Sequence, residues 1–386
     1  MKKQIFIAFT SGLNLGGIET SLISLLDCID YDKYDVDLFL YSHHGELHNL
    51  INKNVNILPE YRELSYLGDT IKEKIKHGAF YSAFIRLVDK PINDSWHYSW
   101  EKVLKFVNPK FKKEYDVALG FFLPFNVIKE YVNAKVKIGW IHTDYSVEKK
   151  QGDYLLYNYS GLDYIAAVSE GSKRAFDSIV PELSNKTFVL ENCLSKNMII
   201  SKSKEPFETF EYDSDSIKLL SIGRYCKAKN FDNIPEILTK IRNAGINAKW
   251  YIIGFGIESE YTLIKNKITE YHMEDYVILL GKKSNPYPYI KNCDIYIQPS
   301  RYEGRSVAVI EAQMLNKPVI ITKYNTSSGQ LVDGFDGIIV PMDNEGCANG
   351  IVDVINNKDL QNRLIENTKK VDYSNSSELE KLYKLF

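Results

Sequence analysis

Two glutamates eight residues apart carry the strongest chemical signal in the chain. Glu303 and Glu311 lie in the segment Ser300–Pro318, where a short loop leads from a predicted strand ending at Gln298 into a predicted helix. Two carboxylates with this spacing are about 12 Å apart along a helix. They can accept hydrogen bonds from sugar hydroxyls on either side of a diphosphate bound at the start of that helix.

The start of this helix is itself a candidate anion site. We expect Arg305, Ser306 and Val307 in its first turn, where unpaired backbone N–H groups and the helix dipole favour a phosphate. The alternative is that Glu303 only caps the helix and Glu311 faces solvent. The neighbours of Glu311 are apolar, namely Val309, Ile310, Ala312 and Met314. An unpartnered carboxylate among them would be costly, which favours a ligand-binding function.

Two cations follow another predicted strand. Arg224 and Lys229 lie in the loop after Ile217–Ile222 and before a predicted helix. Ligands bind at such loops in parallel sheets, and two cations there suit the growing charge of a diphosphate leaving group. Alone, two basic loop residues are more often solvated. Together with the two glutamates they favour a binding site.

The first strand and helix are joined by a glycine-containing loop. Gly16 and Gly17 would let the backbone approach a phosphate or sugar, although a plain turn is an equal alternative. The loop lacks the G-x-G-x-x-G pattern, which disfavours a dinucleotide and hence a nicotinamide-dependent oxidoreductase. His142 ends a predicted strand and should face the crevice between domains, where it could bind hydroxyls; a structural histidine is the alternative.

No metal centre is expected. His43, His44 and His48 have no acidic or cysteine partner at ligand spacing, so we interpret them as a solvated loop. The five cysteines form no C-x-x-C pair, which argues for a reducing compartment. A metal site of the D-x-D type would need its two aspartates in a loop after a strand. Asp35-Val36-Asp37 leads into a strand, and Asp213-Ser214-Asp215 lies in a predicted linker.

Composition sets the broad class. The chain has 386 residues, 44% apolar and 25% charged, and a formal charge of −2. This length predicts two to three domains. A formal charge so close to zero shows no overall excess of positive charge for binding nucleic acid. The longest nearly apolar run, 117–128, is too short to span a bilayer. We expect a cytoplasmic, enzymatic chain.

Short apolar runs alternate with helical patterns, which predicts α/β domains with parallel sheets. The first series of expected strands is Gln4–Phe9, Val36–Tyr41, Val55–Leu58, Asp116–Phe121, Val136–His142, Tyr164–Val168 and Thr187–Leu190. The second is Ile217–Ile222, Lys249–Ile253, Val277–Leu280, Ile295–Gln298, Val319–Thr322 and Gly337–Val340. Expected helices are Ile18–Leu26, Ser99–Phe106, Glu170–Ile179, Phe231–Asn243, Glu258–Tyr271, Ser306–Leu315 and Gly346–Asn356. Two series indicate two Rossmann-like domains.

The expected domains follow from this order. Residues 1–198 would form the first domain, the Ser/Lys/Glu-rich residues 199–216 a linker, and residues 217–372 the second domain. Residues 373–386 carry a cap-like Ser-Asn-Ser-Ser before an amphipathic helix.

A basic and aromatic segment lies at Asp69–Lys90, with Lys72, Lys74 and Lys76 near Phe80 and Phe84. Such a helix can lie on an anionic membrane surface. The alternative is a partly buried helix with a solvated charged face.

Taken together, these segments resemble retaining glycosyltransferases of family 4, whose GT-B architecture pairs two facing Rossmann-like domains. The likeness covers nearly the whole chain. It is most specific at Glu303–Glu311, and further matches are Gly223-Arg224 with Lys229, Gly16-Gly17-x-Glu19, Val168-Ser169-Glu170, Leu190-Glu191-Asn192 and Gly254-Phe255-Gly256. Cys193 and Arg305 depart from the family pattern, with Arg305 standing where the family usually has Phe or Tyr. Trp140-Ile141-His142 is similar to a capsule or cell-wall polysaccharide subgroup.

The resemblance implies transfer of a hexose-type sugar from a nucleotide-diphosphate sugar, with UDP the expected carrier, to a glycan or lipid-linked acceptor. Glu303 would bind the donor sugar and Glu311 the ribose. Arg224, Lys229 and the amides of Ser306 and Val307 would stabilise the departing diphosphate. The acceptor would enter across the first domain, near His142 and the Gly16–Gly17 loop. The nucleotide sugar is a substrate, and no cofactor or metal is implied.

The resemblance also implies a C-terminal helix that crosses back to the first domain. It places the enzyme in the cytoplasm, peripherally on the inner face of the plasma membrane if the basic segment contacts lipid. Two other classes stay open. A nucleotide-sugar 2-epimerase shares this fold and would convert the donor alone to an epimer. A non-catalytic scaffold would bind a sugar nucleotide without transferring or hydrolysing it.

Overall fold

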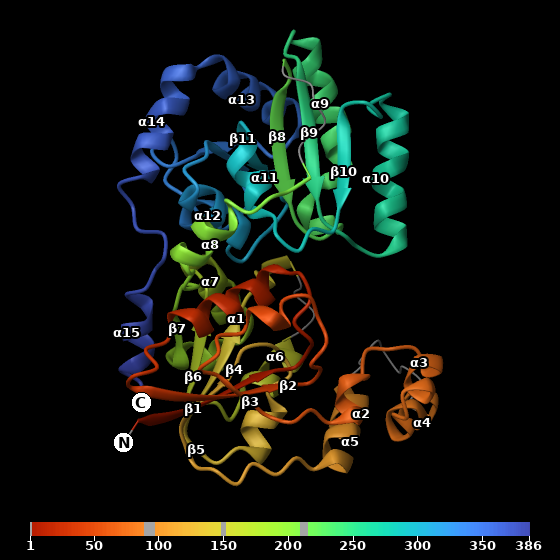
Figure 1. The fold of residues 1–386 in the computed structure, drawn as a ribbon, viewed down its shortest axis with the longest axis vertical. Coiled ribbons are helices and arrows are strands. Elements are labelled where there is room, and N and C mark those ends of the chain that lie inside the picture. The colour runs from red at the N-terminus through yellow and green to blue at the C-terminus, as the bar shows by residue number, and fades with distance from the viewer. Residues whose placement is uncertain (1, 89–96, 148–151, 209–214) are drawn as a thin grey trace.

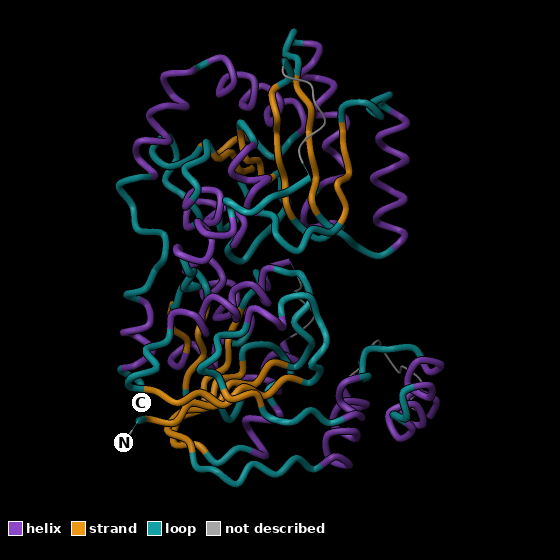
Figure 2. Tube along the Cα trace, in the orientation of Figure 1, coloured by secondary structure: helices purple, strands orange, loops and turns teal. Residues whose placement is uncertain are grey.

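The chain folds into two α/β domains. The computed structural model describes residues 2–88, 97–147, 152–208 and 215–386. The first domain lies below the second in Figure 1, and Figure 2 shows the strands gathered in two separate groups, one in each domain. The prediction of two Rossmann-like domains is confirmed.

The first domain contains a seven-stranded parallel sheet in the order β3-β2-β1-β4-β5-β6-β7. Its strands are β1 (Lys3–Phe9), β2 (Tyr34–Leu40), β3 (Asn56–Ile57), β4 (Tyr115–Gly120), β5 (Ala134–Ile141), β6 (Tyr164–Ala167) and β7 (Thr187–Val189). Its helices are α1 (Gly17–Cys28), α2 (Arg62–Ser65), α3 (Ile71–Lys76), α4 (Phe80–Val88), α5 (His97–Val107), α6 (Gly152–Tyr159) and α7 (Glu170–Ile179). Helix α8 (Lys196–Lys202) comes next in the chain, and its Ile199 is buried in a core cluster of the second domain.

The second domain contains a six-stranded parallel sheet in the order β10-β9-β8-β11-β12-β13. Its strands are β8 (Ile217–Ile222), β9 (Ala248–Ile253), β10 (Val277–Gly281), β11 (Ile295–Gln298), β12 (Val319–Thr322) and β13 (Ile338–Val340). The helices that follow are α9 (Ile234–Asn243), α10 (Glu258–Glu270), α11 (Tyr287–Asn292), α12 (Val307–Met314), α13 (Asn344–Asn356), α14 (Lys358–Thr368) and α15 (Glu378–Tyr383).

Strand β1 shows why the predicted strand segments are apolar at successive positions. Ile5, Ile7 and Phe9 belong to one buried cluster of the first domain, whereas Phe6 and Ala8 belong to the other. Because successive side chains of a strand point to opposite faces, a strand covered on both faces needs apolar residues at every position.

Helix α15 crosses back to the first domain, as expected for the architecture (Figure 1). Leu379 and Leu382 enter the first domain's core, and Tyr383 stacks on Tyr34 with ring centroids 4.3 Å apart. Ser377 occupies the N-cap position, as the predicted cap-like segment requires, but its side chain makes no capping hydrogen bond. Apolar packing holds this helix in place instead.

The basic segment differs from its prediction. Instead of one helix across Asp69–Lys90, the chain forms α3 and α4, separated by a turn in which Gly78 has φ +75°. Lys90 lies outside the described residues, as do residues 209–214 of the predicted linker. Helix α8 covers the beginning of that linker.

The strand orders place the candidate ligand site. In each sheet the order reverses beside the first strand, between β1 and β4 and between β8 and β11. Loops that follow β1, β5, β8, β9 and β11 line one cavity. The carboxyl edges of the two sheets therefore face each other across it, where ligands bind in open α/β sheets.

Candidate active site

The cavity between the domains has a volume of about 380 Å³. Every residue predicted for the site lines it, namely Gly16, Gly17, His142, Arg224, Lys229, Glu303, Ser306, Val307 and Glu311. These residues come from both domains and span most of the chain, so the fold brings the separate motifs together.

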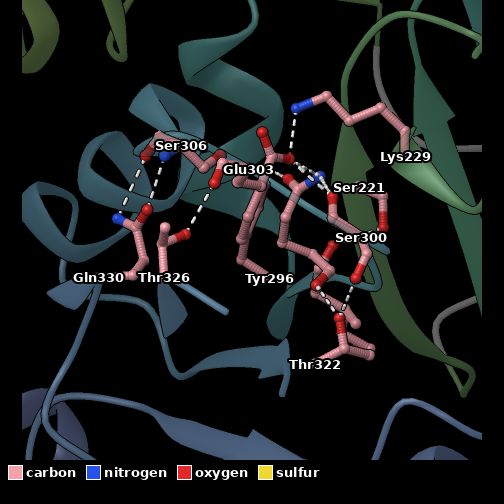
Figure 3. Close-up of polar contacts among 11 residues, drawn as sticks. Ser221, Lys229, Tyr296, Ser300, Glu303, Ser306, Thr322, Thr326 and Gln330 are labelled. Atoms are coloured by element: carbon pink, nitrogen blue, oxygen red, sulfur yellow. Dashed lines mark hydrogen bonds and ion pairs between the residues drawn. The ribbon is translucent and has the colours of Figure 1, made fainter. Parts of the chain in front are cut away.

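The Glu303 carboxylate accepts a converging set of hydrogen bonds. Lys229 Nζ lies 2.5 Å and Ser300 Oγ 2.6 Å from Glu303 Oε1, and Figure 3 shows both side chains pointing at it. Thr326 Oγ1 donates to the Glu303 carbonyl oxygen at 2.7 Å. The carboxylate is thus fixed in the loop between β11 and α12, with a cation beside it.

Gly304, the next residue, is a point of close approach between the domains. A Cβ atom there would lie 2.6 Å from the His142 carbonyl oxygen, and the Gly304 carbonyl accepts a hydrogen bond from Ser169 Oγ at 3.1 Å. Because the contacted atoms are backbone, any larger residue would push the loop between β11 and α12 away from the first domain.

Glu311 is buried, with 4% of its surface exposed, so the alternative of a solvent-facing carboxylate is wrong. The Tyr287 hydroxyl on α11 donates to Glu311 Oε1 at 2.9 Å. Burial raises the pKa of Glu311 to about 7, and the Tyr287 hydrogen bond only partly offsets this. The wall of the cavity thus holds a buried carboxyl group that already accepts one hydrogen bond from the protein.

Helix α12 begins later than predicted. It starts at Val307, Ser306 occupies the N-cap position, and Arg305 precedes the helix, so neither lies in the first turn. The Ser306 amide donates to Gln330 Oε1 at 2.6 Å (Figure 3). It is therefore engaged within the protein, whereas the first-turn amides, beginning with Val307, have no acceptor inside the helix.

The contacts of Arg305 also differ from those expected at the start of a helix. Its guanidinium pairs with Glu191, which follows β7 in the first domain, and Nη1 donates to the Gly329 carbonyl at 3.2 Å. The other oxygen of Glu191 accepts from Asn375 Nδ2 at 3.1 Å. Arg305 thereby ties the loop before α12 to the first domain and to the segment that leads into α15.

Arg224 bridges the two domains. Its Nη2 lies 3.3 Å from Glu19 Oε1 on α1, and 57% of the Arg224 side chain remains exposed toward the cavity. Glu19 is buried, which raises the pKa of its carboxyl despite the nearby Arg224. A Cβ at Gly16 would lie 2.3 Å from Glu19 Oε2 and 3.0 Å from Arg224 Nη2, so a larger residue there would displace this ion pair. Among the described residues, Glu19 Oε2 is a buried atom without a hydrogen-bond partner.

His142 follows the last residue of β5 and lines the cavity from the first domain. Burial lowers the pKa of its imidazole to about 3, so the ring is neutral at physiological pH. Within the part of the chain that the structure describes, its Nε2 is buried without a partner. A neutral ring with one free nitrogen can exchange a hydrogen bond with a ligand hydroxyl.

Sequence reasoning missed two groups that support the site, Tyr287 and Gln330. Each lies 24 residues along the chain from the group it contacts, and neither belongs to a spacing pattern. The motif Leu190-Glu191-Asn192 was noted, but the pairing of Glu191 with Arg305 was not predicted. In the described residues, no group of three or more His, Cys, Asp or Glu side chains could hold a metal ion. The described helices also include none long and apolar enough to cross a membrane.

Residues 202–371, which include nearly all of the second domain, match the family described as Glycosyl transferases group 1. The capsular polysaccharide biosynthesis glycosyltransferase CapM of Staphylococcus aureus is 27% identical over 241 residues, 58% of this chain and 61% of that protein. The uncharacterized glycosyltransferase MJ1059 of Methanocaldococcus jannaschii is 28% identical over 221 residues, 54% of this chain and 53% of that protein. The chain thus spans about half the length of the curated relatives it matches.

Solved structures extend the likeness to the whole fold. HepE of Anabaena with UDP and glucose superposes with a TM-score of 0.70 at 16% identity, covering 100% of this chain and 99% of that one. TarM of S. aureus with UDP gives 0.71 at 15% identity over 100% and 99%. The two facing parallel-sheet domains therefore form a GT-B fold.

Proposed function

We propose that this protein is a retaining glycosyltransferase. It transfers a hexose-type sugar from a UDP-sugar to a glycan or lipid-linked acceptor in cell-surface polysaccharide synthesis. The observation that carries the proposal is that Glu303 and Glu311 line one cavity, with Glu303 before the α12 N-terminus and Glu311 after it. Lys229 contacts Glu303. Two relatives point the same way: CapM is named for capsular polysaccharide, and an Escherichia coli relative as a galactosyltransferase acting on a diphosphoundecaprenol-linked sugar.

The donor would lie along the second domain. Glu311 accepts hydrogen bonds from the ribose, and Glu303 from hydroxyls of the donor sugar. Between them the diphosphate contacts the Arg224 and Lys229 cations and the α12 amides from Val307 onward. Lys229 can serve both groups because its ammonium has three donors and already touches Glu303.

Transfer breaks the bond between the anomeric carbon and the β-phosphate oxygen and forms a bond from that carbon to the acceptor oxygen on the same face. The acceptor proton passes to the leaving phosphate, so no protein nucleophile is needed. Arg224 and Lys229 meet charge that grows as the bond breaks, which lowers the barrier more than it tightens donor binding. They supply this charge without a metal ion. The neutral His142 holds a sugar hydroxyl through its free nitrogen.

The test is a panel of sugar nucleotides, assayed for donor hydrolysis and for transfer to glycan and lipid-linked acceptors. One donor should be consumed with release of UDP, and Glu303→Gln should lose this activity. Conversion of the donor to an epimer without UDP release would support the 2-epimerase instead. Binding of a sugar nucleotide with neither outcome would support a non-catalytic scaffold.

A further inference from the structure

Helix α4 presents an apolar face to solvent. Phe80, Phe84, Leu87 and Val88 are 65%, 55%, 59% and 54% exposed, and their spacing places them on one side of the helix. The opposite side, with Ser82, Ala83 and Ile85, is buried in the first domain. A helix of a globular protein ordinarily shows the reverse pattern toward solvent, with charged residues outward.

Neighbouring helices extend this face. Ile75 on α3 is 50% exposed, and Phe106 on α5 is 57% exposed while it stacks on Tyr81 of α4 with ring centroids 3.9 Å apart. Figure 1 shows α3 and α4 projecting from the side of the first domain, away from its sheet. The six residues Ile75, Phe80, Phe84, Leu87, Val88 and Phe106 form what we call the α3–α5 apolar patch.

Buried polar contacts fix the orientation of α4, so that the residues of the α3–α5 apolar patch face solvent. Lys74 is 1% exposed and donates to the carbonyls of Tyr66 and Leu67, at 2.5 and 2.8 Å, and to Ser82 Oγ at 2.6 Å. Glu63 accepts the backbone N–H of Ser82 at 2.7 Å, near the start of α4. These bonds fix which side of α4 faces inward, so its apolar side has no place in the domain core.

Lys74 therefore cannot contact lipid, contrary to its expected function in the basic segment. The exposed lysines beside the patch are Lys72 and Lys76 on α3 and Lys105 on α5. Lys76 pairs with Glu73 at 3.3 Å. An apolar centre bordered by exposed ammonium groups is complementary to a bilayer with anionic headgroups, because the side chains can enter the acyl region while the lysines meet phosphate.

We propose that the α3–α5 apolar patch inserts into an anionic phospholipid bilayer and docks the first domain on it. Hydrophobic insertion supplies most of the attachment, and the lysines supply a smaller, salt-sensitive share. This inference extends the proposed function, since it brings the cavity to the surface where a lipid-linked acceptor would lie. Lipid attachment itself can be measured without any sugar nucleotide.

The experiment is flotation of the full chain with vesicles of phosphatidylethanolamine containing about 30% phosphatidylglycerol, at low salt and at about 0.5 M NaCl. Phe84→Ser/Leu87→Ser should lower the vesicle-bound fraction about tenfold or more at both salt concentrations. Lys72→Glu/Lys105→Glu should lower it mainly at low salt. The matched control is Leu263→Ser/Val332→Ser, which removes exposed apolar residues of the second domain and should bind like wild type.

Thermal unfolding and donor hydrolysis by Phe84→Ser/Leu87→Ser check that its fold and cavity are intact. Retained hydrolysis with lost flotation supports the patch, whereas an absence of hydrolysis in every chain would contradict the proposed function and leave the flotation result standing. Wild-type protein that stays unbound to vesicles overturns the inference. So does a double variant that floats normally but loses a dimer seen by light scattering, because the patch would then join two copies.

Discussion

Arg224 is the residue whose kinetics report most directly on charge development. Its exposed guanidinium is oriented by Glu19 before any ligand arrives. In the proposed mechanism it meets charge that grows in the transition state, so Arg224→Ala should lower kcat by about 10²-fold while the donor KM changes far less. Steady-state kinetics measure both constants, with Arg363→Ala, an exposed arginine on α14, as the control. A change in KM alone would assign Arg224 to positioning.

Glu311 gives a pH-dependent effect on stability. Its folded-state pKa of about 7 is above the ordinary carboxyl value, so the folded chain binds this proton more tightly than the unfolded chain does. Stability is therefore lost as pH rises from about 4.5 to 7, and the cost of ionising this buried group is complete above pH 7.

Glu311→Gln removes that cost. The variant should be more stable than wild type at pH 8 by about 1–3 kcal/mol, and the gain should shrink at pH 5. Thermal or urea unfolding at the two pH values, without ligand, measures the difference. An equal difference at both pH values would show that Glu311 does not titrate in this range.

At the scale of elements, the strand pattern was predictable because both faces of each sheet are covered. Every expected strand occurs within two residues of its predicted ends. The short helices α2, α8 and α11 were not expected, since segments of four to seven residues carry too little periodicity. The α12 start was predicted one residue too early, and the hydrogen bond from the Ser306 amide to Gln330, 24 residues away, could not be read from the local sequence.

The same limit applies to the site. Types and spacing of Glu303, Glu311, Arg224 and Lys229 predicted side chains that do line one cavity. The interactions of Tyr287 with Glu311 and of Lys74 with Ser82 depend on tertiary packing alone. A local sequence pattern cannot predict a hydrogen-bond partner that comes from another helix or strand.

Helix α15 should stabilise the first domain, although it follows the second domain in the sequence. Leu382 is 1% exposed in that domain's core. Leu382→Ala should lower the free energy of unfolding of the first domain by about 2–5 kcal/mol, because it removes buried apolar atoms and leaves a cavity. Urea unfolding measures this, with the exposed Lys384→Ala as control. If both variants unfold like wild type, the helix contributes nothing to the domain.

At the scale of the whole molecule, ion pairs join the two domains around the cavity. Glu19 pairs with Arg224, Glu46 with Lys282, and Glu191 with Arg305. Each pair joins a carboxylate of the first domain to a cation of the second. One of these cations, Arg224, is the residue proposed to contact the diphosphate, so donor binding and the approach of the two domains involve the same side chain.

In the proposed mechanism protein cations supply the charge for the leaving diphosphate, so activity should not depend on a divalent metal. Transfer rates should be unchanged, within about twofold, by excess EDTA and by added Mn²⁺ after EDTA treatment. The assay uses the donor identified by the nucleotide-sugar panel. Activity that disappears with EDTA and returns with Mn²⁺ would contradict the proposed mechanism.

The central claim is that the cavity binds a nucleotide sugar with Glu311 at the ribose and Glu303 at the reacting sugar. Isothermal titration of UDP into Glu303→Gln and Glu311→Gln, beside turnover of the donor, tests it most directly. Glu303→Gln should lose most turnover, by about 10²-fold, and bind UDP nearly as wild type does. Glu311→Gln should weaken UDP binding by about 1.5–3 kcal/mol, the loss of a charge-assisted hydrogen bond. Loss of UDP binding in Glu303→Gln but not in Glu311→Gln would invert these functions, and unchanged binding and turnover in both would contradict the site itself.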